Sequence, residues 1–239
     1  MSKWQEYRLD EIGDVIGGGT PSSKIDTYWN GDIGWITPAD LSGYKFKYIS
    51  DGSRNITKLG LKKSSAKLHP KNTVLMTSRA PIGYLAIAEK PIATNQGFQS
   101  IRCNQEIADF TFVYYLLKAY KEGIALIASG ATFPEVSGEK VKQYKVSLPQ
   151  LPIQKKIVKI LSIYDNLIEI NLKRIMLLEE SARHTYEEWF QRFKVNSKKL
   201  EIDPDTKLPF GWVWSKVGSL LHEVKATAKI KSQNILKSG

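Results

Sequence analysis

The spacing of apolar residues changes once along the chain, near residue 150. Before that point the apolar runs are short and are interrupted by Gly, Pro and other turn residues, which is typical of short strands. We expect strands over residues 33–37, 44–49, 73–78, 84–88, 98–103 and 144–148. One longer segment, 109–122, contains "FVYYLLKAY" and predicts a helix with Asp109 as its N-cap. This part of the chain therefore predicts a mixed α/β domain.

A single long helix is predicted after that domain. Residues 153–194 contain neither Gly nor Pro, and Pro152 stands at the start, where a helix tolerates it. Apolar residues recur at steps of three and four, the pattern of an amphipathic helix of roughly 60 Å. Such a stripe predicts a partner helix, as in a coiled coil, and a buried Asn171 near its middle would set the register. The proposed partner positions are Ile157, Ile160, Tyr164, Leu167, Asn171, Ile175, Leu178, Tyr186 and Trp189.

A weak repeat follows the helix. After the polar segment "DPDTKLPFGW", the stretch "WVWSKVGSL" aligns with "WQEYRLDEI" near the start of the chain at a constant offset of 208. The matched pairs are Trp4 with Trp212, Arg8 with Lys216, Leu9 with Val217, and Ile12 with Leu220. This pattern predicts that a second copy of the first domain begins there. We therefore expect three parts, over residues 1–150, 151–195 and 196–239.

The net charge of the chain indicates what kind of partner it binds. The chain has 35 Lys and Arg against 24 Asp and Glu, a net charge of +11. Residues 45–71 hold eight of the basic residues and a single acid, Asp51. This excess favours an anionic partner, nucleic acid first, although a solvated lysine-rich edge that prevents aggregation is the alternative. Within it, aromatic residues alternate with lysines over 44–48, as in a strand with one basic face. The candidate phosphate contacts are Lys45, Lys47, Arg54, Lys58, Lys62 and Lys63.

The sequence offers little for catalysis or metal binding. Cys103 is the single cysteine, so a disulfide within the chain and a thiolate cluster are excluded, and the three histidines lack metal-ligand spacing. The stretch "GDVIGGGTPSS" lacks the lysine of a phosphate-binding loop and the third glycine of a dinucleotide fingerprint. We expect no catalytic residue and no metal site. Without a long apolar run or a signal segment, we also expect no membrane association and a cytoplasmic location.

Several motifs, in order, resemble the specificity (S) subunit of type I restriction–modification systems. They are "GGGTPSSKIDTYWNGDIGWITPADL", "TSRAPIGYLAIA", "ATNQGFQSI", "ASGATFPEVSGEKVKQYKVSLPQLP" and "LPIQKKIVKILSIYDNLIEIN". The resemblance covers residues 4–194 and the restart at Trp212. Gln150 and Ile153 replace the Pro and Glu that are usual at the helix entry. Members of the family usually carry two recognition domains and two helices, whereas this chain has one of each.

The resemblance implies a non-catalytic DNA-recognition subunit: one α/β target recognition domain followed by a long coiled-coil helix. It implies double-stranded DNA, methyltransferase subunits and restriction subunits as partners, with AdoMet, ATP and Mg²⁺ bound by those other subunits. A second copy, paired antiparallel through the helix, would supply the second recognition domain and produce a palindromic split site. A stand-alone DNA-binding dimer, a half that pairs with an unlike subunit, and an inactive truncated remnant stay open. The glycine-rich stretch is expected to be a tight backbone passage in the scaffold.

Candidate base-reading residues come from the loops of those motifs: Thr37, Arg79, Asn95, Gln96 and Thr132. Arg pairs with guanine through two hydrogen bonds, and Asn or Gln with adenine. Each has a structural alternative. Arg79 would be a buried structural arginine, Asn95 and Gln96 would satisfy turn backbone, and Thr37 would end a strand.

Overall fold

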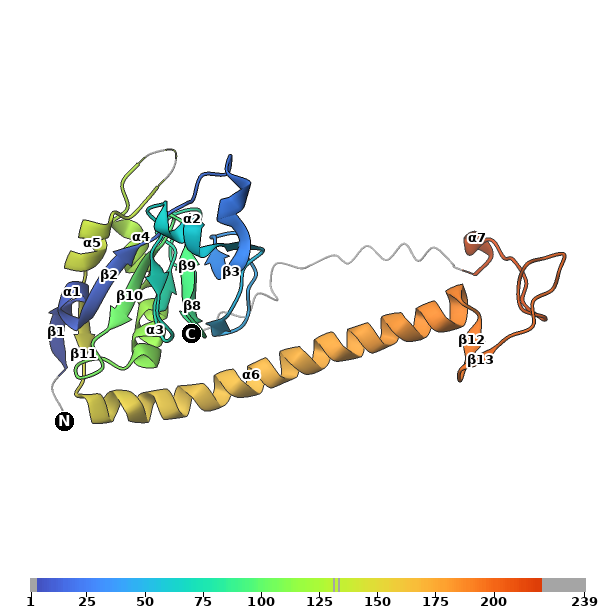
Figure 1. Ribbon diagram of the computed structural model, residues 1–239. Coiled ribbons are helices and arrows are strands. Elements are labelled where there is room, and N and C mark those ends of the chain that lie inside the picture. Colours follow the sequence, from blue (N-terminus) through green and yellow to red (C-terminus); the bar gives the residue numbers. More distant parts are fainter. Residues whose placement is uncertain (1–3, 131, 133, 221–239) are drawn as a thin grey trace. The chain divides into compact units, whose positions relative to one another are not determined.

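The structure is a computed structural model that describes residues 4–130, 132 and 134–220 (Figure 1). The chain divides into two compact units, Met1–Lys173 and Arg174–Gly239. The border lies within the long helix α6 (Leu151–Tyr186), whose first part belongs with the first unit. The predicted borders at residues 150 and 195 mark changes of element and stay predictions.

The described part of the first unit contains a mixed set of sheets. A five-stranded sheet has the order β2-β10-β7-β8-β4, a four-stranded sheet has the order β5-β3-β9-β6, and β1 pairs with β11. The pairs β3–β9 and β4–β8 are parallel and the other pairs are antiparallel. The strands are β1 (Gln5–Arg8), β2 (Gly13–Gly17), β3 (Trp29–Ile36), β4 (Tyr48–Ile49), β5 (Arg54–Ile56), β6 (Leu68–His69), β7 (Val74–Met76), β8 (Leu85–Ala88), β9 (Ile92–Thr94), β10 (Gln99–Cys103) and β11 (Lys145–Leu148).

Most of the predicted strands are confirmed, with one exception. The segments 33–37, 73–78, 84–88, 98–103 and 144–148 each contain an observed strand. The predicted strand over 44–49 is wrong for most of its length, because only Tyr48–Ile49 is a strand. Gly43 has a φ of +73°, which turns the chain, and Tyr44 and Phe46 pack edge to face at 5.6 Å in the loop that follows. The alternation of aromatic residues and lysines therefore belongs to a loop.

The five-stranded sheet is covered on both faces, and the alternation of side chains along β7 shows how. Val74 and Met76 point into the main core, which contains residues of α1 (Leu9–Ile12), α3 (Phe110–Ala119), α4 (Lys121–Leu126) and α5 (Gly138–Gln143). Leu75, between them, points into a second core that includes Ile36 of β3 and Ile92 of β9. In Figure 1 α5 accordingly lies to the left of β2 and β10, and β3 lies to their right.

The predicted helix over 109–122 is confirmed as α3 followed by α4. Asp109 is the N-cap of α3, since its Oδ1 accepts the backbone N–H groups of Thr111 and Phe112 at 2.9 Å. The helix buries Phe112, Val113 and Leu117 in the main core. Tyr115, on another side of α3, is only half-buried and faces the start of α6.

The predicted long helix is also confirmed. α6 has 36 residues and continues into a π-helical turn, η2 (Glu187–Gln191). Near its start, the side chain of Gln154 is fully buried. Its Oε1 accepts the backbone N–H of Asp109 at 2.9 Å, and its Nε2 donates to the carbonyl oxygens of Ile107 and Pro149, also at 2.9 Å. This amide ties the helix start to the loop that precedes α3.

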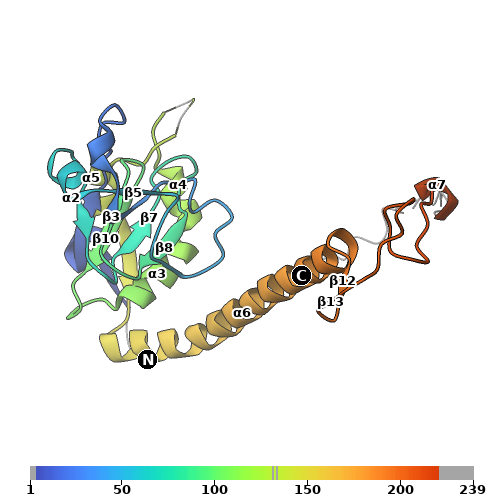
Figure 2. The same ribbon diagram turned by 45° about the vertical axis from the view of Figure 1, so that its right-hand side comes forward.

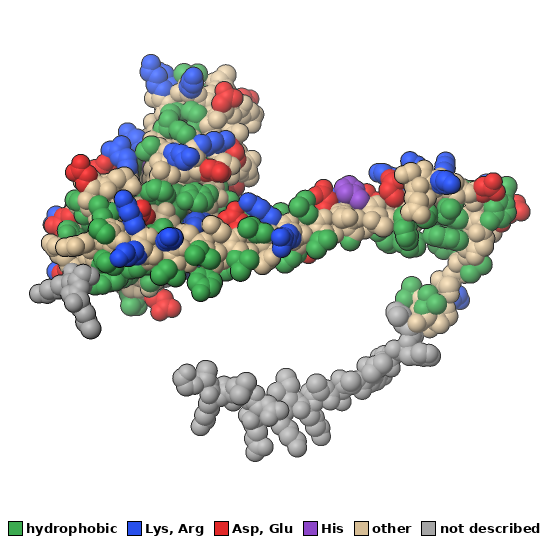
Figure 3. All heavy atoms as spheres, turned by 90° about the horizontal axis from the view of Figure 1, so that it is seen from below, with side chains coloured by type: hydrophobic (Ala, Val, Ile, Leu, Met, Phe, Trp, Pro, Cys, Tyr) green, Lys and Arg blue, Asp and Glu red, His purple; other side chains and the backbone are tan. Residues whose placement is uncertain are grey.

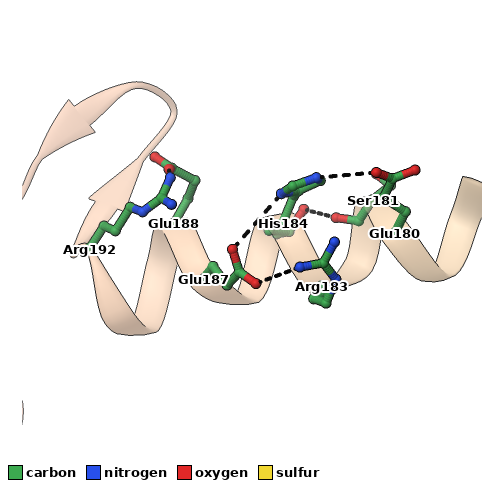
Figure 4. Close-up of polar contacts among 8 residues, drawn as sticks. Glu180, Ser181, Arg183, His184, Glu187, Glu188 and Arg192 are labelled. Carbon is green, nitrogen blue, oxygen red and sulfur yellow. Dashed lines mark hydrogen bonds and ion pairs between the residues drawn. The ribbon is translucent and has the colours of Figure 1, made fainter. Parts of the chain in front are cut away.

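In the second unit, ion pairs line the end of the helix (Figure 4). Arg183 pairs with Glu187 at 2.9 Å and His184 lies 3.6 Å from Glu180, in each case one turn along the helix. Such pairs stabilise a solvated helix by a few tenths of a kcal/mol each, about 0.2–0.5. A short hairpin of β12 (Lys194–Val195) and β13 (Lys198–Lys199) follows.

The described part of this unit includes the residues of the weak repeat, and the second domain predicted to begin there stays a prediction. Helix α7 (Val217–Leu220) corresponds at the offset of 208 to α1 (Leu9–Ile12), and both helices have four residues. In α1 the two apolar side chains are fully buried, whereas those of α7 are about 70% exposed: Val217 at 69% and Leu220 at 70%. The rest of this restart, residues 221–239, lies outside the described residues. Within the described residues, the four-residue helix therefore recurs with its two apolar side chains exposed.

Candidate nucleic-acid interface

The loops that carry the predicted base-reading residues converge at one edge of the domain. β3 and β9 are parallel, and Ile36 pairs with Thr94, so Thr37 and Asn95 follow at the same sheet edge. Gly97 marks the meeting point. A Cβ atom at Gly97 would lie 3.1 Å from Asn95 Oδ1 and from Pro38 Cγ, and 3.5 Å from Arg79 Cγ. Residues 37–38, 79–80 and 95–97, with the glycine-rich residues 18–20, are called the loop cluster below.

The glycine-rich stretch is a tight backbone passage, as expected. A side chain at Gly18 would clash with the carbonyl oxygen of Asn95, and one at Gly19 would clash with the backbone of Ser65 and Ala66. Two buried indoles hold the passage in place. Trp35 Nε1 donates to the carbonyl oxygen of Gly19 at 2.9 Å, and Trp29 Nε1 donates to that of Ser22 at 3.0 Å.

The passage also reaches a predicted base reader. The Thr20 hydroxyl donates a hydrogen bond to Oε1 of Gln96, and both side chains are exposed. Figure 2 shows the segment between β2 and β3 at the top of the domain, at the opposite end from the start of α6. Sequence reasoning had not singled out Thr20, although its position directly after three glycines marked a close approach of two backbones.

Thr37 is better explained by its structural alternative. Its backbone N–H and its hydroxyl both donate to Asp40 Oδ2, at 2.8 and 2.6 Å. Burial would raise the pKa of Asp40, but hydrogen bonds from Thr37 and Ser53 outweigh it and hold that pKa below its ordinary value. The Thr37 hydroxyl is thus committed to the turn that ends β3. An acidic residue three positions after a threonine was the signal that sequence reasoning passed over.

Arg79 is not a buried structural arginine. Its guanidinium pairs with Glu135 at 3.2 Å, and both side chains are more than a third exposed. Glu135 also pairs through its backbone with Ser129, and the exposed Thr132 lies between these two residues in the chain. Asn95 is half-buried, and its Oδ1 accepts the backbone N–H of Gly97 at 2.9 Å, as its structural alternative predicts.

Of the predicted base readers, three therefore keep accessible side chains near the loop cluster or on the loop paired with it: Arg79, Gln96 and Thr132. Exposed and neighbouring polar groups of this kind are what reading a base edge requires. Each remains a prediction as a base contact.

Four of the candidate phosphate contacts form a basic segment next to the loop cluster. Arg54 lies on β5, Lys58 and Lys62 lie on α2 (Lys58–Lys62), and Lys63 caps that helix. All four are exposed, and the residues just after them, Ser65 and Ala66, pack against Gly19 of the loop cluster. The guanidinium of Arg54 also stacks on the ring of Trp29 at 3.5 Å. The Trp29 ring thus orients the Arg54 cation.

The other two candidates do not belong to this segment. Lys47 is wrong as a phosphate contact, because its side chain is buried, with 7% exposure. Its Nζ instead lies 3.4 Å from Ser162 Oγ and 3.5 Å from the Tyr115 hydroxyl. Lys45 is exposed but lines a cleft with Phe46 and with Ile168 of α6. Sequence alternation suggested one basic face for both, and the loop conformation separates them.

The predicted partner positions lie on α6 and, for Trp189, on η2, and they are exposed with one correction. Ile157 is half-buried against the main core, so it contacts the α/β domain of its own chain. The other positions have exposed side chains and are called the apolar stripe below: Ile160, Tyr164, Leu167, Asn171, Ile175, Leu178, Tyr186 and Trp189. Figure 3 shows hydrophobic side chains recurring along α6. Exposed apolar residues that recur along one helix form a patch, and such patches mark interaction surfaces more often than scattered single residues do.

Two side chains with reactive groups, Cys103 and His69, have pKa values shifted by their surroundings. Burial raises the pKa of the Cys103 thiol to about 12, and burial together with Arg102 lowers the pKa of His69 to about 4. No three His, Cys, Asp or Glu side chains are placed to hold a metal ion within residues 4–130, 132 and 134–220. Over the same residues, the structure contains no helix with the length and apolarity that a membrane crossing needs.

Relatives with known names share both the sequence and the fold. The chain is 41% identical over 223 residues to the MjaIX specificity subunit, a type I restriction enzyme subunit of Methanocaldococcus jannaschii; the match covers 91% of this chain and 51% of that protein. It is 26% identical over 164 residues to the EcoprrI specificity subunit of Escherichia coli, covering 64% of this chain and 40% of that protein. The chain thus spans about half the length of the curated relatives it matches, or less.

Solved structures agree at the level of the fold. The S subunit of a type I restriction–modification system from M. genitalium superposes with a TM-score of 0.56 at 20% identity, over 79% of this chain and 46% of that one. The HsdS subunit from Thermoanaerobacter tengcongensis gives 0.53 at 21% identity, over 72% and 39%. The model of the type I restriction modification DNA specificity domain matches residues 1–180. The chain therefore belongs to the family of type I restriction–modification DNA specificity subunits.

Proposed function

We propose that this chain is a non-catalytic subunit that recognises double-stranded DNA and directs methyltransferase and restriction subunits to a split site. The observation that carries the proposal is the loop cluster. It contains the accessible side chains of Arg79 and Gln96, and its Gly19 packs against Ser65 and Ala66, which directly follow the exposed basic segment. Phosphate contacts position a protein on DNA, and base contacts specify the sequence. The basic segment and the loop cluster would supply the two kinds of contact from one surface.

The second half of the split site would come from a second copy of this chain. The apolar stripe is exposed, and burying it requires another helix. Charges along α6 favour an antiparallel partner. The first turns carry Lys155, Lys156 and Lys159. The far end, continued by η2, has Arg183 and an excess of acidic residues: Glu179, Glu180, Glu187 and Glu188. An antiparallel pair brings opposite charges together, whereas a parallel pair would align like charges.

A pair of this kind would relate two identical recognition domains by a two-fold axis. The recognised site would then be a palindrome of two half-sites with a spacer of any sequence between them. At 1.5 Å per residue, the 36 residues of α6 extend about 54 Å. One turn of DNA is about 34–36 Å, so the helix is long enough to separate half-sites by a full turn.

The chemistry of methylation and cleavage would belong to the partner subunits. AdoMet, ATP and Mg²⁺ would bind there, and this chain would contribute recognition and spacing in a cytoplasmic complex.

The test is to co-express the full chain with its cognate methyltransferase subunit in a host that lacks DNA methylation, and to sequence the methylated genome. The methyltransferase subunit expressed alone is the control. A palindromic motif with a spacer of fixed length is the expected result. An asymmetric motif would mean that an unlike subunit supplies the second half. Absence of methylation, with the complex shown to be intact, would contradict the proposal and leave a stand-alone DNA-binding protein or an inactive remnant.

A further inference from the structure

A polar cluster joins the recognition domain to the side of α6. Lys47 comes from the loop before β4, Tyr115 from α3, and Ser162 and Asp165 from α6. The Tyr115 hydroxyl donates to Asp165 Oδ2 at 2.6 Å and lies 3.3 Å from Ser162 Oγ. Lys47 Nζ completes the set, at 3.4 Å from Ser162 Oγ and 3.5 Å from the Tyr115 hydroxyl. These four residues are called the polar clasp.

The clasp has few alternative arrangements. Lys47 is 93% removed from solvent, since its exposure is 7%, and its ammonium lies within 6 Å of two aromatic rings, those of Tyr48 and Tyr115. A buried ammonium is tolerated only where it keeps its partners. If α6 turned or slid against the domain, Ser162 and Asp165 would move away and leave Lys47 and Tyr115 without them. The charge therefore favours one placement of the helix.

Tyr115 is held in the state that the clasp needs. Burial, and then the hydrogen bond to Asp165, raise the pKa of Tyr115 well above its ordinary value. The phenol stays protonated at every physiological pH and remains a donor to the carboxylate. A hydrogen bond to a charged acceptor is about twice as strong as one between neutral groups.

The clasp and the apolar stripe lie on different sides of the helix. Gln154, Ser162 and Asp165 face the domain, and with 3.6 residues per turn they share one side of α6. Tyr164 and Leu167 of the apolar stripe are exposed on another side. The helix can therefore bind a partner along the stripe while the clasp keeps its attachment to the domain.

We infer that the polar clasp sets the angle between the recognition domain and α6, and thereby the length of the spacer between the two half-sites. This inference rests on the proposed function. One additional base pair moves a half-site by about 3.4 Å along DNA and turns it by about 35° around the axis. A domain that swings on its helix would accept several spacers. Lys47, Tyr115 and Asp165 are positioning residues that restrict it to one.

The first experiment measures the angle directly and does not depend on DNA. Spin labels at Lys58→Cys on α2 and Asn166→Cys on α6, in a Cys103→Ala background, report one distance by double electron–electron resonance. Excess unlabelled chain keeps the measured pairs within one molecule.

Two variants weaken the polar clasp. Tyr115→Phe removes the hydroxyl and keeps the ring, and Lys47→Met removes the charge and keeps the aliphatic part of the side chain. Tyr114→Phe is the matched control, because it removes a hydroxyl from the neighbouring residue of the same helix.

The expected result is a broader or displaced distance distribution for Tyr115→Phe and for Lys47→Met, with wild-type width for Tyr114→Phe. Distributions that match the wild type in both clasp variants would overturn the inference, whatever the DNA results are. A circular dichroism melt of each variant confirms that it is folded, and Tyr115→Phe, the milder change, carries the test if Lys47→Met unfolds.

The second experiment repeats the methylated-genome sequencing with the same three variants. Tyr115→Phe should keep the half-site sequences and add methylation at spacers one base pair shorter and longer. Tyr114→Phe should keep the single spacer. A single unchanged spacer in the clasp variants would contradict the inference, as would a change in the half-site sequences. If the wild-type chain directs no methylation, the proposed function fails, and the distance measurement still decides whether the clasp sets the angle.

Discussion

The recognition domain and α6 treat their apolar residues in opposite ways. In the domain, large side chains such as Phe98, Leu117 and Ile101 are fully buried between sheets and helices. In α6, every residue of which is described, the one buried side chain is that of a glutamine, Gln154. The domain therefore completes its own core, whereas the helix leaves its apolar face for another surface. We therefore propose that folding and partner binding are assigned to different segments of the same chain.

The largest effect is expected from a charge in the apolar stripe. Leu167 is 56% exposed in the single chain and would be buried in a helix pair, so Leu167→Asp should prevent pairing. Burying a leucine stabilises by roughly 1.5–3 kcal/mol, and burying an unpaired carboxylate costs more than that. Sedimentation velocity at micromolar concentration should change from dimer to monomer, with the near-ultraviolet circular dichroism of the domain unchanged.

The adjacent residue supplies the control for that experiment. Asn166→Asp adds the same charge at an exposed position outside the stripe and should leave the dimer intact. If both variants dissociate alike, net charge and not the stripe governs association. If neither does, the apolar face of α6 does not pair two copies.

A second prediction concerns the stability of the domain at acidic pH. His69 is fully buried, its Nε2 lies 3.1 Å from Thr94 Oγ1, and its pKa is lowered to about 4 from an ordinary 6.5. The unfolded chain therefore binds more protons between these values, and stability is lost as pH falls from 6.5 towards 4. From pH 7 to pH 5 this group should cost about 2 kcal/mol in the free energy of unfolding.

Urea unfolding followed by tryptophan fluorescence measures that loss. In His69→Gln, which keeps a hydrogen-bonding group without a titrating one, the difference between pH 7 and pH 5 should shrink by the same amount. An equal pH dependence in both proteins would show that His69 does not report on the core. This experiment measures the stability of the domain and does not depend on whether the helices pair.

A third prediction concerns base reading by Arg79. Arg79→Lys keeps the charge and removes the paired hydrogen bonds, so one position of each half-site should lose about 1–3 kcal/mol of discrimination. In a pair of identical domains, the relaxation should appear at two symmetric positions of the methylated motif. Arg102→Lys, whose exposed arginine pairs with Asp14 on neighbouring strands, is the control. A motif unchanged by Arg79→Lys would show that Arg79 does not read a base.

The smallest effect is expected from the basic segment. Lys62→Gln removes one exposed cation next to the loop cluster and should weaken binding to all DNA sequences alike. The slope of log K against log salt should decrease by about 0.9 for each phosphate that the protein no longer neutralises. Fluorescence anisotropy with a labelled duplex at several salt concentrations measures it. Lys145→Gln, whose lysine pairs with Glu6 at 2.9 Å on the β1–β11 sheet, should leave the slope as it is.

Local signals predicted much of the fold. The Asp109 cap and the long helix after Pro152 depend on residues within a few positions of one another, and the structure confirms both. The prediction of a strand over 44–49 is wrong for a related reason. Alternating aromatic residues and lysines resemble a strand face, and only Gly43, with its positive φ, indicated the turn.

The site was less predictable, because its contacts join distant residues. Lys47 contacts Tyr115 and Ser162, which lie 68 and 115 positions away from it in the sequence. Arg79 contacts Glu135, which lies 56 positions away. No short sequence pattern predicts contacts between such distant residues. Lys47 was therefore predicted as a phosphate contact, and the polar clasp was not predicted. The loop cluster was partly foreseen, since the family motifs pointed to its loops, although Thr37 belongs to a turn.

We propose that two copies, joined through the apolar stripe, supply the two recognition domains of one split site. The most direct test is the mass of the purified full chain in solution, by sedimentation equilibrium over a range of micromolar concentrations. We expect a species of twice the chain mass of 27.0 kDa, which Leu167→Asp converts to single chains. A wild-type chain that stays at 27.0 kDa throughout that range would contradict it.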